Sequence, residues 1–369
     1  MFTKIKRIVV KVGSSILTSE RSYLSQAKVK KIVCSIVELM KDYNKEVILV
    51  SSGAIACGMS VLKLKKRPSD LSTLQAAAAI GQGKLMNTYE KYFSQYNYHT
   101  AQILLTIDGL HHRVRYLNAR NTINSLLNLN IVPIVNENDT VATEEIKFGD
   151  NDNLSAQVAM LTNSDLLILL SDVDGFCVTE GKTCKVLSTI DTIDEDLKKH
   201  LYEVRGGKTV GGMRSKLETG FMLMKLGLPT IIANGNKKDI LGRIVSGKEE
   251  GTLFMPHQKR QTSKKSWLAF TATSSTAGSI VVDHGAYCAL VEGGKSLLAS
   301  GITSLKGEFK FGDAVRIVNH EGTEFAKGIT NFSHNELELI KGKKTSQIKE
   351  ILGNKNYDEV IHRDNMIIL

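Results

Sequence analysis

The sequence has few cysteines, few prolines and a single tryptophan, and these scarcities exclude several classes of protein. Its 369 residues include 5 Cys, 4 Pro and 1 Trp. The cysteines are scattered and form no CxxC pair, which argues against a zinc knuckle and a disulfide framework and favours a reducing compartment. One tryptophan offers no stacking platform for single-stranded nucleic acid. No apolar stretch has the length of a signal peptide or a membrane span, so we expect a cytoplasmic protein without a membrane partner.

The rest of the composition, with 42% hydrophobic and 23% charged residues, is typical of a globular protein. At ~150 residues per domain, the length predicts two domains. The formal net charge of +10 points to anionic partners such as a nucleotide, a nucleic acid or a carboxylate substrate. Residues 260–369 hold 14 Lys or Arg against 12 Asp or Glu. This near-neutral final third disfavours RNA binding as its main role.

Strand-like and helical patterns alternate over roughly the first 260 residues. Apolar runs typical of strands lie at residues 5–12, 46–50, 101–105, 131–135, 166–170 and 230–233. A helical pattern follows Ser25, a residue type that caps helix N-termini, with apolar residues at 29, 32, 33, 36, 37 and 40 on one face. The alternation predicts an α/β fold with a mostly parallel sheet sandwiched by helices. Ligands of such sheets bind beyond the carboxyl ends of the strands, so a site is expected there.

The pattern changes at the polar and basic string HQKRQTSKK, residues 257–265, which is typical of a linker. Beyond it, β-like segments with frequent glycines lie at 279–283, 288–291, 314–319 and 328–331, and a helical stretch lies at 346–352. These segments predict a smaller, mostly β C-terminal domain. We therefore expect domains over residues 1–258 and 273–369, joined by a linker over residues 259–272.

Three strings that carry glycine, hydroxyl and lysine residues follow or precede the predicted elements. In KVGSS (11–15), Lys11 can aim an ammonium group at a phosphate while Gly13 allows close backbone approach, although a solvated lysine in a turn is the simpler interpretation. In SSGAI (51–55), the hydroxyls suit either an anion or simple helix capping. In VGGMRSK (210–216), two glycines precede Lys216 by one helical turn, as in phosphate-binding helix starts. Neither a Walker A loop nor a GxGxxG string occurs, which disfavours those nucleotide folds.

The fourth string, NENDTVATEEIKFGDNDN (136–153), is rich in Asn, Asp and Glu. A solvated polar loop is its simplest interpretation. However, its last five residues stand directly before an apolar helical run at 154–161. Amide and carboxylate groups near a helix N-terminus are suited to binding an ammonium group and orienting lysine side chains. The spacing does not fit an EF-hand calcium loop.

Together, and in this order and spacing, the strings resemble the amino-acid kinase family over nearly the whole chain, and within it the branch that phosphorylates L-glutamate. The matching strings are KVGSS, SSGAIACG, LNARNT, VPIVNENDTVATEEIKFGDNDNLSA and GGMRSK. The C-terminal strings VDHGAYCAL, GKSLLASGI and GEFKFGDAV resemble a PUA domain. The resemblance implies transfer of the γ-phosphoryl group of ATP to the glutamate side-chain carboxylate, giving L-glutamyl 5-phosphate for proline biosynthesis. It also implies Mg²⁺ with ATP, feedback inhibition by proline, and a homo-oligomer (dimer or tetramer).

The resemblance also implies roles for individual residues. Lys11 and Lys216 would contact the transferring phosphoryl group, and Asp152 would orient both lysines. L-glutamate would bind to Ser52, Asp139 and Asn151, with Asp139 holding the α-ammonium group. ATP would bind to Lys11, Gly13, Ser171, Asp172, Val210, Gly211, Gly212, Met213, Arg214, Ser215 and Lys216. The family usually has Thr at position 171 and often at 210; Ser171 keeps a hydroxyl and Val210 does not. No residue is assigned as a direct metal ligand.

The chemistry of the residues agrees with this activity. A glutamate side chain, with a pKa of about 4.3, is already ionised at neutral pH and needs no general base. The obstacle is repulsion between two anions, which two lysines, backbone N–H groups and Mg²⁺ can neutralise. Two alternatives stay open: another carboxylate kinase of the family, such as an acetylglutamate or carbamate kinase, and an RNA-binding PUA protein. The long polar loop and the C-terminal module argue against the first, and the charge balance argues against the second.

Overall fold

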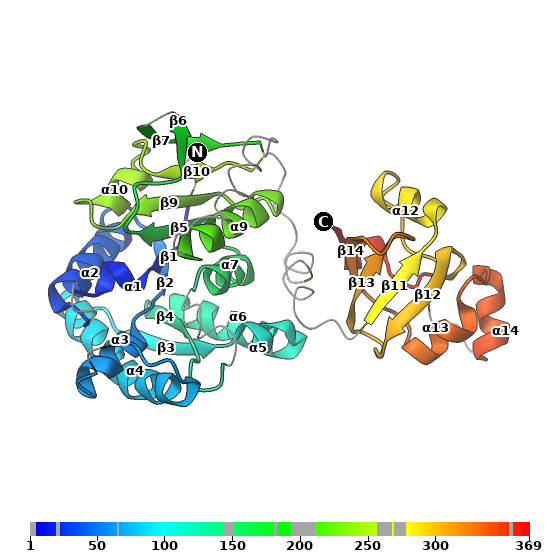
Figure 1. Cartoon of the computed structure of the whole chain (residues 1–369), viewed down its shortest axis with the longest axis horizontal. Coiled ribbons are helices and arrows are strands. Elements are labelled where there is room, and N and C mark those ends of the chain that lie inside the picture. The colour runs from blue at the N-terminus through cyan, green and yellow to red at the C-terminus, as the bar shows by residue number, and fades with distance from the viewer. Residues whose placement is uncertain are drawn as a thin grey trace. The chain divides into compact units, whose positions relative to one another are not determined.

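The structure, a computed structural model, describes residues 5–19, 23–64, 66–142, 151–180, 183–192, 211–256, 268, 278–353 and 357–369. The chain forms two compact units that divide near residue 260 (Figure 1). Each unit has its own sheet and its own hydrophobic core. Among the described residues, no helix combines the length and the apolar character needed to cross a bilayer.

The first unit is built on an eight-stranded sheet in the order β3-β4-β2-β1-β5-β9-β10-β8. Its strands are β1 (Arg7–Val12), β2 (Glu46–Val50), β3 (Thr100–Leu105), β4 (Val132–Glu137), β5 (Leu166–Ser171), β8 (Thr189–Ile190), β9 (Thr230–Asn234) and β10 (Thr252–Phe254). Within this sheet β9 and β10 pair antiparallel, and the other neighbouring strands pair parallel. The six strands predicted from apolar runs are all present, which confirms the predicted sheet.

Helices cover both faces of this sheet, with α2 and α10 on one face and α7 and α9 on the other (Figure 1). The helices are α1 (Ser14–Leu17), α2 (Gln26–Lys41), α3 (Ala54–Val61), α4 (Leu71–Phe93), α5 (Ile107–His111), α6 (Arg113–Asn128), α7 (Asp152–Leu161), α9 (Gly211–Lys225) and α10 (Ile240–Val245). Ser25 caps α2 by accepting a hydrogen bond from the Lys28 N–H at 3.4 Å, as predicted. The predicted apolar face of α2 is buried except for Met40, which is half-buried.

A two-stranded hairpin, β6 (Cys177–Glu180) and β7 (Thr183–Val186), lies outside the main sheet. Cys177 is disulfide-bonded, so the expectation of a chain without disulfides is wrong at this position. Its partner lies outside the described side chains.

The second unit contains a five-stranded sheet in the order β12-β11-β13-β14-β15. Its elements are β11 (Gly278–Val282), α12 (His284–Val291), β12 (Ile302–Gly307), β13 (Ala314–Val318), β14 (Glu324–Ile329), α13 (His334–Ile340), α14 (Ile348–Leu352) and β15 (Met366–Ile368). The β-like segment predicted at 288–291 is wrong, because these residues end helix α12. Asp283 caps that helix by accepting from the Ala286 N–H at 2.7 Å, and a four-residue apolar run fits a helix as well as a strand.

The parallel strands bring several chemically distinctive residues to one edge of the first sheet. Lys11 is the second-last residue of β1, Ser51 follows β2, Asn136 is the second-last residue of β4, and Ser171 ends β5. Because β1 pairs parallel with both β2 and β5, and β2 pairs parallel with β4, the carboxyl ends of these four strands lie along the same edge. This edge is where ligands are expected in an open parallel sheet.

Candidate active site

Two lysines meet at one buried carboxylate. The Lys11 Nζ lies 2.5 Å from Asp152 Oδ1, and the Lys216 Nζ lies 3.0 Å from Asp152 Oδ2. Lys11 is 2% exposed, Lys216 is 6% exposed and Asp152 is 0% exposed. They come from β1, α9 and α7, so the fold joins distant parts of the chain here. We call these three residues the lysine cluster; with two ammonium groups and one carboxylate, it has a formal charge of +1, which suits an anion.

The secondary structure explains why the lysine cluster is stable. Asp152 is the first residue of α7, where the backbone N–H groups and the helix dipole favour a negative charge. Lys216 also donates to the Gly212 carbonyl at 3.0 Å, one turn earlier in α9. A Cβ atom at Gly212 would lie 3.4 Å from the Lys216 Nζ, and one at Gly13 would lie 4.0 Å from the Lys11 Nζ. Larger residues at these two positions would therefore fill the space beside the amines.

The other residues predicted to bind ATP lie partly along the same edge. Ser171 is buried at the end of β5 and donates to Asp172 Oδ1 at 3.1 Å, while Asp172 is exposed. The Gly13 N–H is already bonded to the Leu170 carbonyl at 3.2 Å, so the role expected of Gly13 is close backbone approach and not donation from this N–H. Arg214 pairs with Glu218 at 2.8 Å on the exposed face of α9. Val210 lies outside the described residues. Helix α9 begins with the rest of the predicted string, which includes Gly211, Met213, Ser215 and Lys216.

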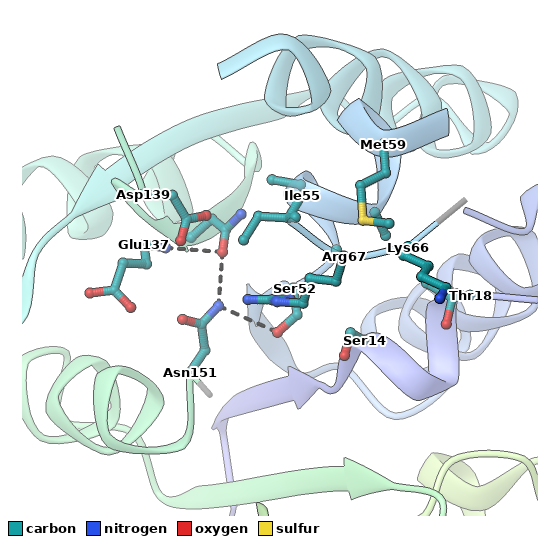
Figure 2. A pocket seen from close by; sticks show the side chains of 14 residues that line it. Ser14, Thr18, Ser52, Ile55, Met59, Lys66, Arg67, Glu137, Asp139 and Asn151 are labelled. Carbon is teal, nitrogen blue, oxygen red and sulfur yellow. Dashed lines mark hydrogen bonds between the residues drawn. The ribbon is translucent and has the colours of Figure 1, made fainter. Parts of the chain in front are cut away.

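A cavity of about 410 Å³ lies at the same edge, and we call it the acceptor pocket. It contains the three residues predicted to bind glutamate, Ser52, Asp139 and Asn151 (Figure 2). The full lining is Ser14, Thr18, Ser52, Gly53, Ala54, Ile55, Ala56, Met59, Lys66, Arg67, Asn136, Glu137, Asp139 and Asn151. Because Asn151 and Asp152 are consecutive residues, the acceptor pocket adjoins the lysine cluster.

Hydrogen bonds from Asn151 tie the two sides of the acceptor pocket together. Its Nδ2 donates to the Ser51 carbonyl at 2.6 Å and to Asn136 Oδ1 at 2.8 Å, and it lies 3.4 Å from Ser52 Oγ. All four residues are buried, with 7% exposure or less. The loop that separates Asn136 from Asn151 in the sequence lies partly outside the described residues, at 143–150. The structure nevertheless brings the two ends of the predicted polar string together.

Asp139, an acidic residue of the acceptor pocket, has a pKa above its ordinary value. Burial raises the pKa of Asp139 to about 6, and the positive charge of Arg67 offsets part of this effect. A carboxylate held in this state favours a ligand that supplies a cation, because the new charge would compensate for the lost water. This is the property expected of a site for an ammonium group.

Among the lining residues of the acceptor pocket that were not predicted as site residues, four have a charged or amide side chain: Lys66, Arg67, Asn136 and Glu137. Arg67 extends its side chain into the pocket (Figure 2). Its one signal in the sequence is the basic run at 65–67, which is typical of a solvated loop. Asn136 and Glu137 belong to the polar string that was singled out, but the pattern gave no reason to prefer them over their neighbours.

The described residues contain no group of three or more His, Cys, Asp or Glu that could hold a metal ion. The buried carboxylate nearest to the lysines, Asp152, already faces an ammonium group with each oxygen. Mg²⁺ usually keeps several waters and is held by substrate phosphates with one or two carboxylates. A magnesium ion held mainly by phosphate oxygens would be compatible with these residues.

Comparison with known proteins gives the family of the chain. The profile of the amino acid kinase family matches residues 6–234. The chain belongs to this family. A second profile, that of the PUA domain, matches residues 278–352. The two matches confirm both parts of the resemblance seen in the sequence.

Individual amino acid kinases extend the match to nearly the full chain. The glutamate 5-kinase of Caldanaerobacter subterraneus subsp. tengcongensis is 46% identical over 367 residues, 98% of this chain and 98% of that protein. The glutamate 5-kinase of Carboxydothermus hydrogenoformans is 45% identical over 369 residues, 99% of this chain and 98% of that protein. A solved UMP kinase from Bacillus anthracis superposes with a TM-score of 0.47 at 17% identity, covering 68% of this chain and 95% of the other.

Proposed function

We propose that this protein catalyses the ATP-dependent phosphorylation of the side-chain carboxylate of L-glutamate, giving L-glutamyl 5-phosphate, the first step of proline biosynthesis. The observation that carries the proposal is the lysine cluster, buried beside a pocket that contains Asp139. Relatives at 45–46% identity over nearly the whole chain have the name glutamate 5-kinase, which supports the same activity.

In the proposed reaction, a carboxylate oxygen of glutamate forms a bond to the γ-phosphorus of ATP while the bond to the β,γ-bridging oxygen breaks. The electron pair of the broken bond leaves with ADP, and no proton has to move. Lys11 and Lys216 stabilise the negative charge on the transferring group and the leaving oxygen. Asp152 holds both amines in place and is not a base. When bound together with ATP, Mg²⁺ would supply further neutralising charge.

The acceptor pocket has a charge arrangement that suits an amino acid. We infer that Asp139 binds the α-ammonium group and that Arg67 faces the α-carboxylate. The two side chains thus carry the charges opposite to those of the zwitterion. Ser52 and Asn151 complete the polar lining on the side of the lysine cluster. N-acetylglutamate lacks the ammonium group and would leave Asp139 unpaired, which disfavours an acetylglutamate kinase.

The remaining assignments rest on the family resemblance. ATP would bind along Lys11, Gly13, Ser171, Asp172 and the α9 start, with Mg²⁺ as its ion. The two family profiles support a kinase domain over residues 1–258, a linker over 259–272 and a PUA domain over 273–369. Homo-oligomer formation stays a prediction.

Proline has an ammonium group and a carboxylate but no side-chain carboxylate. It could therefore occupy the part of the acceptor pocket that includes Asp139 without accepting a phosphoryl group. The expected inhibitor site spans residues 139–147, of which 143–147 lie outside the described residues. Inhibition by proline should then weaken as the glutamate concentration rises. Inhibition that is independent of glutamate would count against a shared site.

The deciding experiment follows ADP release from MgATP and traps the labile acyl phosphate with hydroxylamine. We expect glutamate-dependent ADP release with an equal amount of glutamyl hydroxamate. N-acetylglutamate and carbamate serve as competing acceptors, and a preference for either would overturn the proposal. A salt-dependent titration of the full chain with RNA tests the remaining alternative, and tight binding without kinase activity would favour it.

A further inference from the structure

A chain of amide groups connects helix α4 to the acceptor pocket. Gln82, in the middle of α4, accepts a hydrogen bond from Asn136 Nδ2 at 2.9 Å. Asn136 Oδ1 in turn accepts from the Glu137 N–H at 2.9 Å and from Asn151 Nδ2 at 2.8 Å. Asn136 is 2% exposed and Asn151 is 6% exposed, so water has little access to these contacts. We call Gln82, Asn136 and Asn151 the amide relay.

The direction of every hydrogen bond in the amide relay follows from one backbone group. The Glu137 N–H can only donate, so the oxygen of the Asn136 amide must face it. The nitrogen of Asn136 must then face Gln82, which has to offer its oxygen. Because Asn136 Oδ1 is an acceptor, Asn151 must present its nitrogen, whose second hydrogen goes to the Ser51 carbonyl at 2.6 Å.

The consequence for the acceptor pocket is the orientation of Asn151. Both hydrogens of its amide nitrogen are used inside the protein, so the group that remains for a ligand is the oxygen. Figure 2 shows the nitrogen of Asn151 at the dashed hydrogen bonds and the oxygen turned away from them. Asn151 and Asp139 both line the pocket. Together they offer two acceptors to an ammonium group.

Gln82 itself shows which end of its amide is important. Its Nε2 is buried and has no hydrogen-bond partner within the described part of the chain. Gln82 also lines a second cavity, of about 300 Å³, which shares Glu137 and Asp139 with the acceptor pocket. A buried N–H without a partner is costly, so the oxygen contact to Asn136 is the one that holds the side chain in this orientation.

We propose that Gln82 is a positioning residue for substrate recognition: its oxygen holds the amide relay in the orientation in which Asn151 presents an acceptor to the α-ammonium group of L-glutamate. This inference rests on the proposed function. Without an acceptor at position 82, the buried Asn136 nitrogen loses its partner. Asn136 can regain one only by leaving its place, which releases Asn151.

The test compares two substitutions at Gln82 and two acceptor substrates. Gln82→Met removes the oxygen at nearly equal length, whereas Gln82→Glu keeps an oxygen acceptor. L-glutamate carries the α-ammonium group, and glutarate has the same two carboxylates without it. We expect Gln82→Met to raise the KM for glutamate about tenfold and to leave kcat, the KM for MgATP and the KM for glutarate within about twofold. Gln82→Glu should stay within about threefold of the unmodified protein for all of them.

The matched control is Thr88→Val on the same helix. The Thr88 hydroxyl bonds within α4, to the Lys84 carbonyl at 2.8 Å, and takes no part in the amide relay. This variant should leave the ratio of the two KM values unchanged. Gln82→Leu repeats the comparison if the methionine variant does not fold.

Three outcomes would overturn the inference. An equal loss for glutamate and glutarate would show a general packing role, and an unchanged KM in Gln82→Met would show that the relay needs no acceptor at 82. A folded Gln82→Glu protein as impaired as Gln82→Met would show that the nitrogen is the important end. If the unmodified protein forms no glutamyl hydroxamate, the proposed function fails; if it does and the Gln82 variants behave differently from expectation, only this inference fails.

Discussion

The lysine cluster and the acceptor pocket adjoin each other but are organised in opposite ways. In the lysine cluster, three charged groups with 6% exposure or less compensate one another inside the protein. In the acceptor pocket, neutral amides and hydroxyls share the lining with Asp139, Glu137, Lys66 and Arg67. The pKa of Asp139 is raised by burial, and Arg67 lies on an exposed loop. The groups proposed to meet the phosphoryl group are thus fixed in advance, whereas the charge of the pocket is completed by the substrate.

This difference has a physical reason. Preorganised cations stabilise a transition state at no reorganisation cost, so burial of the lysine cluster favours rate. Recognition of a small zwitterion instead requires a pocket that is less stable when it is empty or when it holds a ligand of the wrong charge. A half-buried Asp139 meets this requirement, because Arg67 compensates its ionised form only in part and an ammonium group would supply the remaining positive charge. The predictions below test this contrast, beginning with the largest effect.

Removing an amine from the lysine cluster should affect the rate more than any other change. We expect Lys216→Ala or Lys11→Ala to lower kcat by about 10²- to 10³-fold at saturating glutamate and MgATP, because one charge-stabilising group is lost. Lys225→Ala, an exposed lysine in the last turn of α9, is the matched control and should retain full activity. Rates within a few-fold of normal in the first two variants would remove these lysines from the mechanism.

A change in the acceptor pocket should instead affect affinity. We expect Asp139→Asn to raise the KM for glutamate about 10- to 100-fold, since a hydrogen bond between charged groups is lost, while the KM for MgATP stays near normal. Glutarate lacks the ammonium group and should be affected much less. Steady-state kinetics with both acceptors measures this. Equal effects on the two would show that Asp139 does not recognise the ammonium group.

The raised pKa of Asp139 predicts a pH dependence with a definite sign. Burial places this pKa at about 6, above the ordinary value near 3.9, so the contribution of Asp139 to stability is present at low pH and is lost as pH rises through 6. Glutamate binding follows the opposite trend, because the ammonium group needs the ionised form. The KM for glutamate should therefore rise about tenfold between pH 7 and pH 5.

The control for this pH dependence is Asp139→Asn, in which the KM for glutamate should be nearly flat over the same range. The side chain of free glutamate, with a pKa of about 4.3, remains mostly ionised at pH 5 and does not obscure the result. A pH profile that is unchanged by the substitution would assign the titration to another group.

Arg67 should have a smaller effect, since a charge pair near solvent is screened. We expect Arg67→Gln to raise the KM for glutamate about fivefold and to leave the KM for 4-aminobutyrate, which has no α-carboxylate, unchanged. Lys63→Gln, an exposed neighbour outside the pocket lining, controls for the change in net charge. An equal effect on both substrates would exclude contact between Arg67 and the α-carboxylate.

The smallest effect is expected below the acceptor pocket, at Tyr89. This fully buried side chain shares a 2.8 Å hydrogen bond with Ser51 Oγ, which also donates to the Ser52 carbonyl at 3.2 Å. Tyr89→Phe should lower the free energy of unfolding by about 1 kcal/mol and leave kcat and KM within twofold. Urea unfolding followed by circular dichroism measures the first. A large loss of activity would place this hydroxyl pair in the site itself.

Much of the fold could be predicted because local patterns and tertiary structure agree. The six apolar runs became strands, and Ser25 caps α2. The apolar pattern at 288–291 wrongly predicted a strand, because these residues end helix α12, which Asp283 caps at its N-terminus. In the site, glycine and lysine at strand and helix ends marked Lys11 and Lys216, because phosphate chemistry imposes those residue types near those ends.

The rest of the site could not be predicted because it depends on contacts without a local pattern. Gln82 lies in an ordinary helical stretch, and its importance arises from an amide 54 residues away in the sequence. Arg67 belongs to a basic run that is indistinguishable from a solvated loop. Cys177 is disulfide-bonded, but no cysteine spacing around it in the sequence indicates a disulfide. The roles of all three residues depend on contacts that the folded chain makes, and a local sequence pattern does not indicate such contacts.

The adjacency of Asn151 and Asp152 has one more consequence. A single peptide bond separates Asn151, which we propose to face the amino acid, from Asp152, which holds both amines and begins α7. We therefore expect a ligand that displaces Asn151 to displace Asp152 as well. If the two proposed substrate sites are coupled through this peptide bond, the two substrates should bind with synergy although they never need to touch the same side chain.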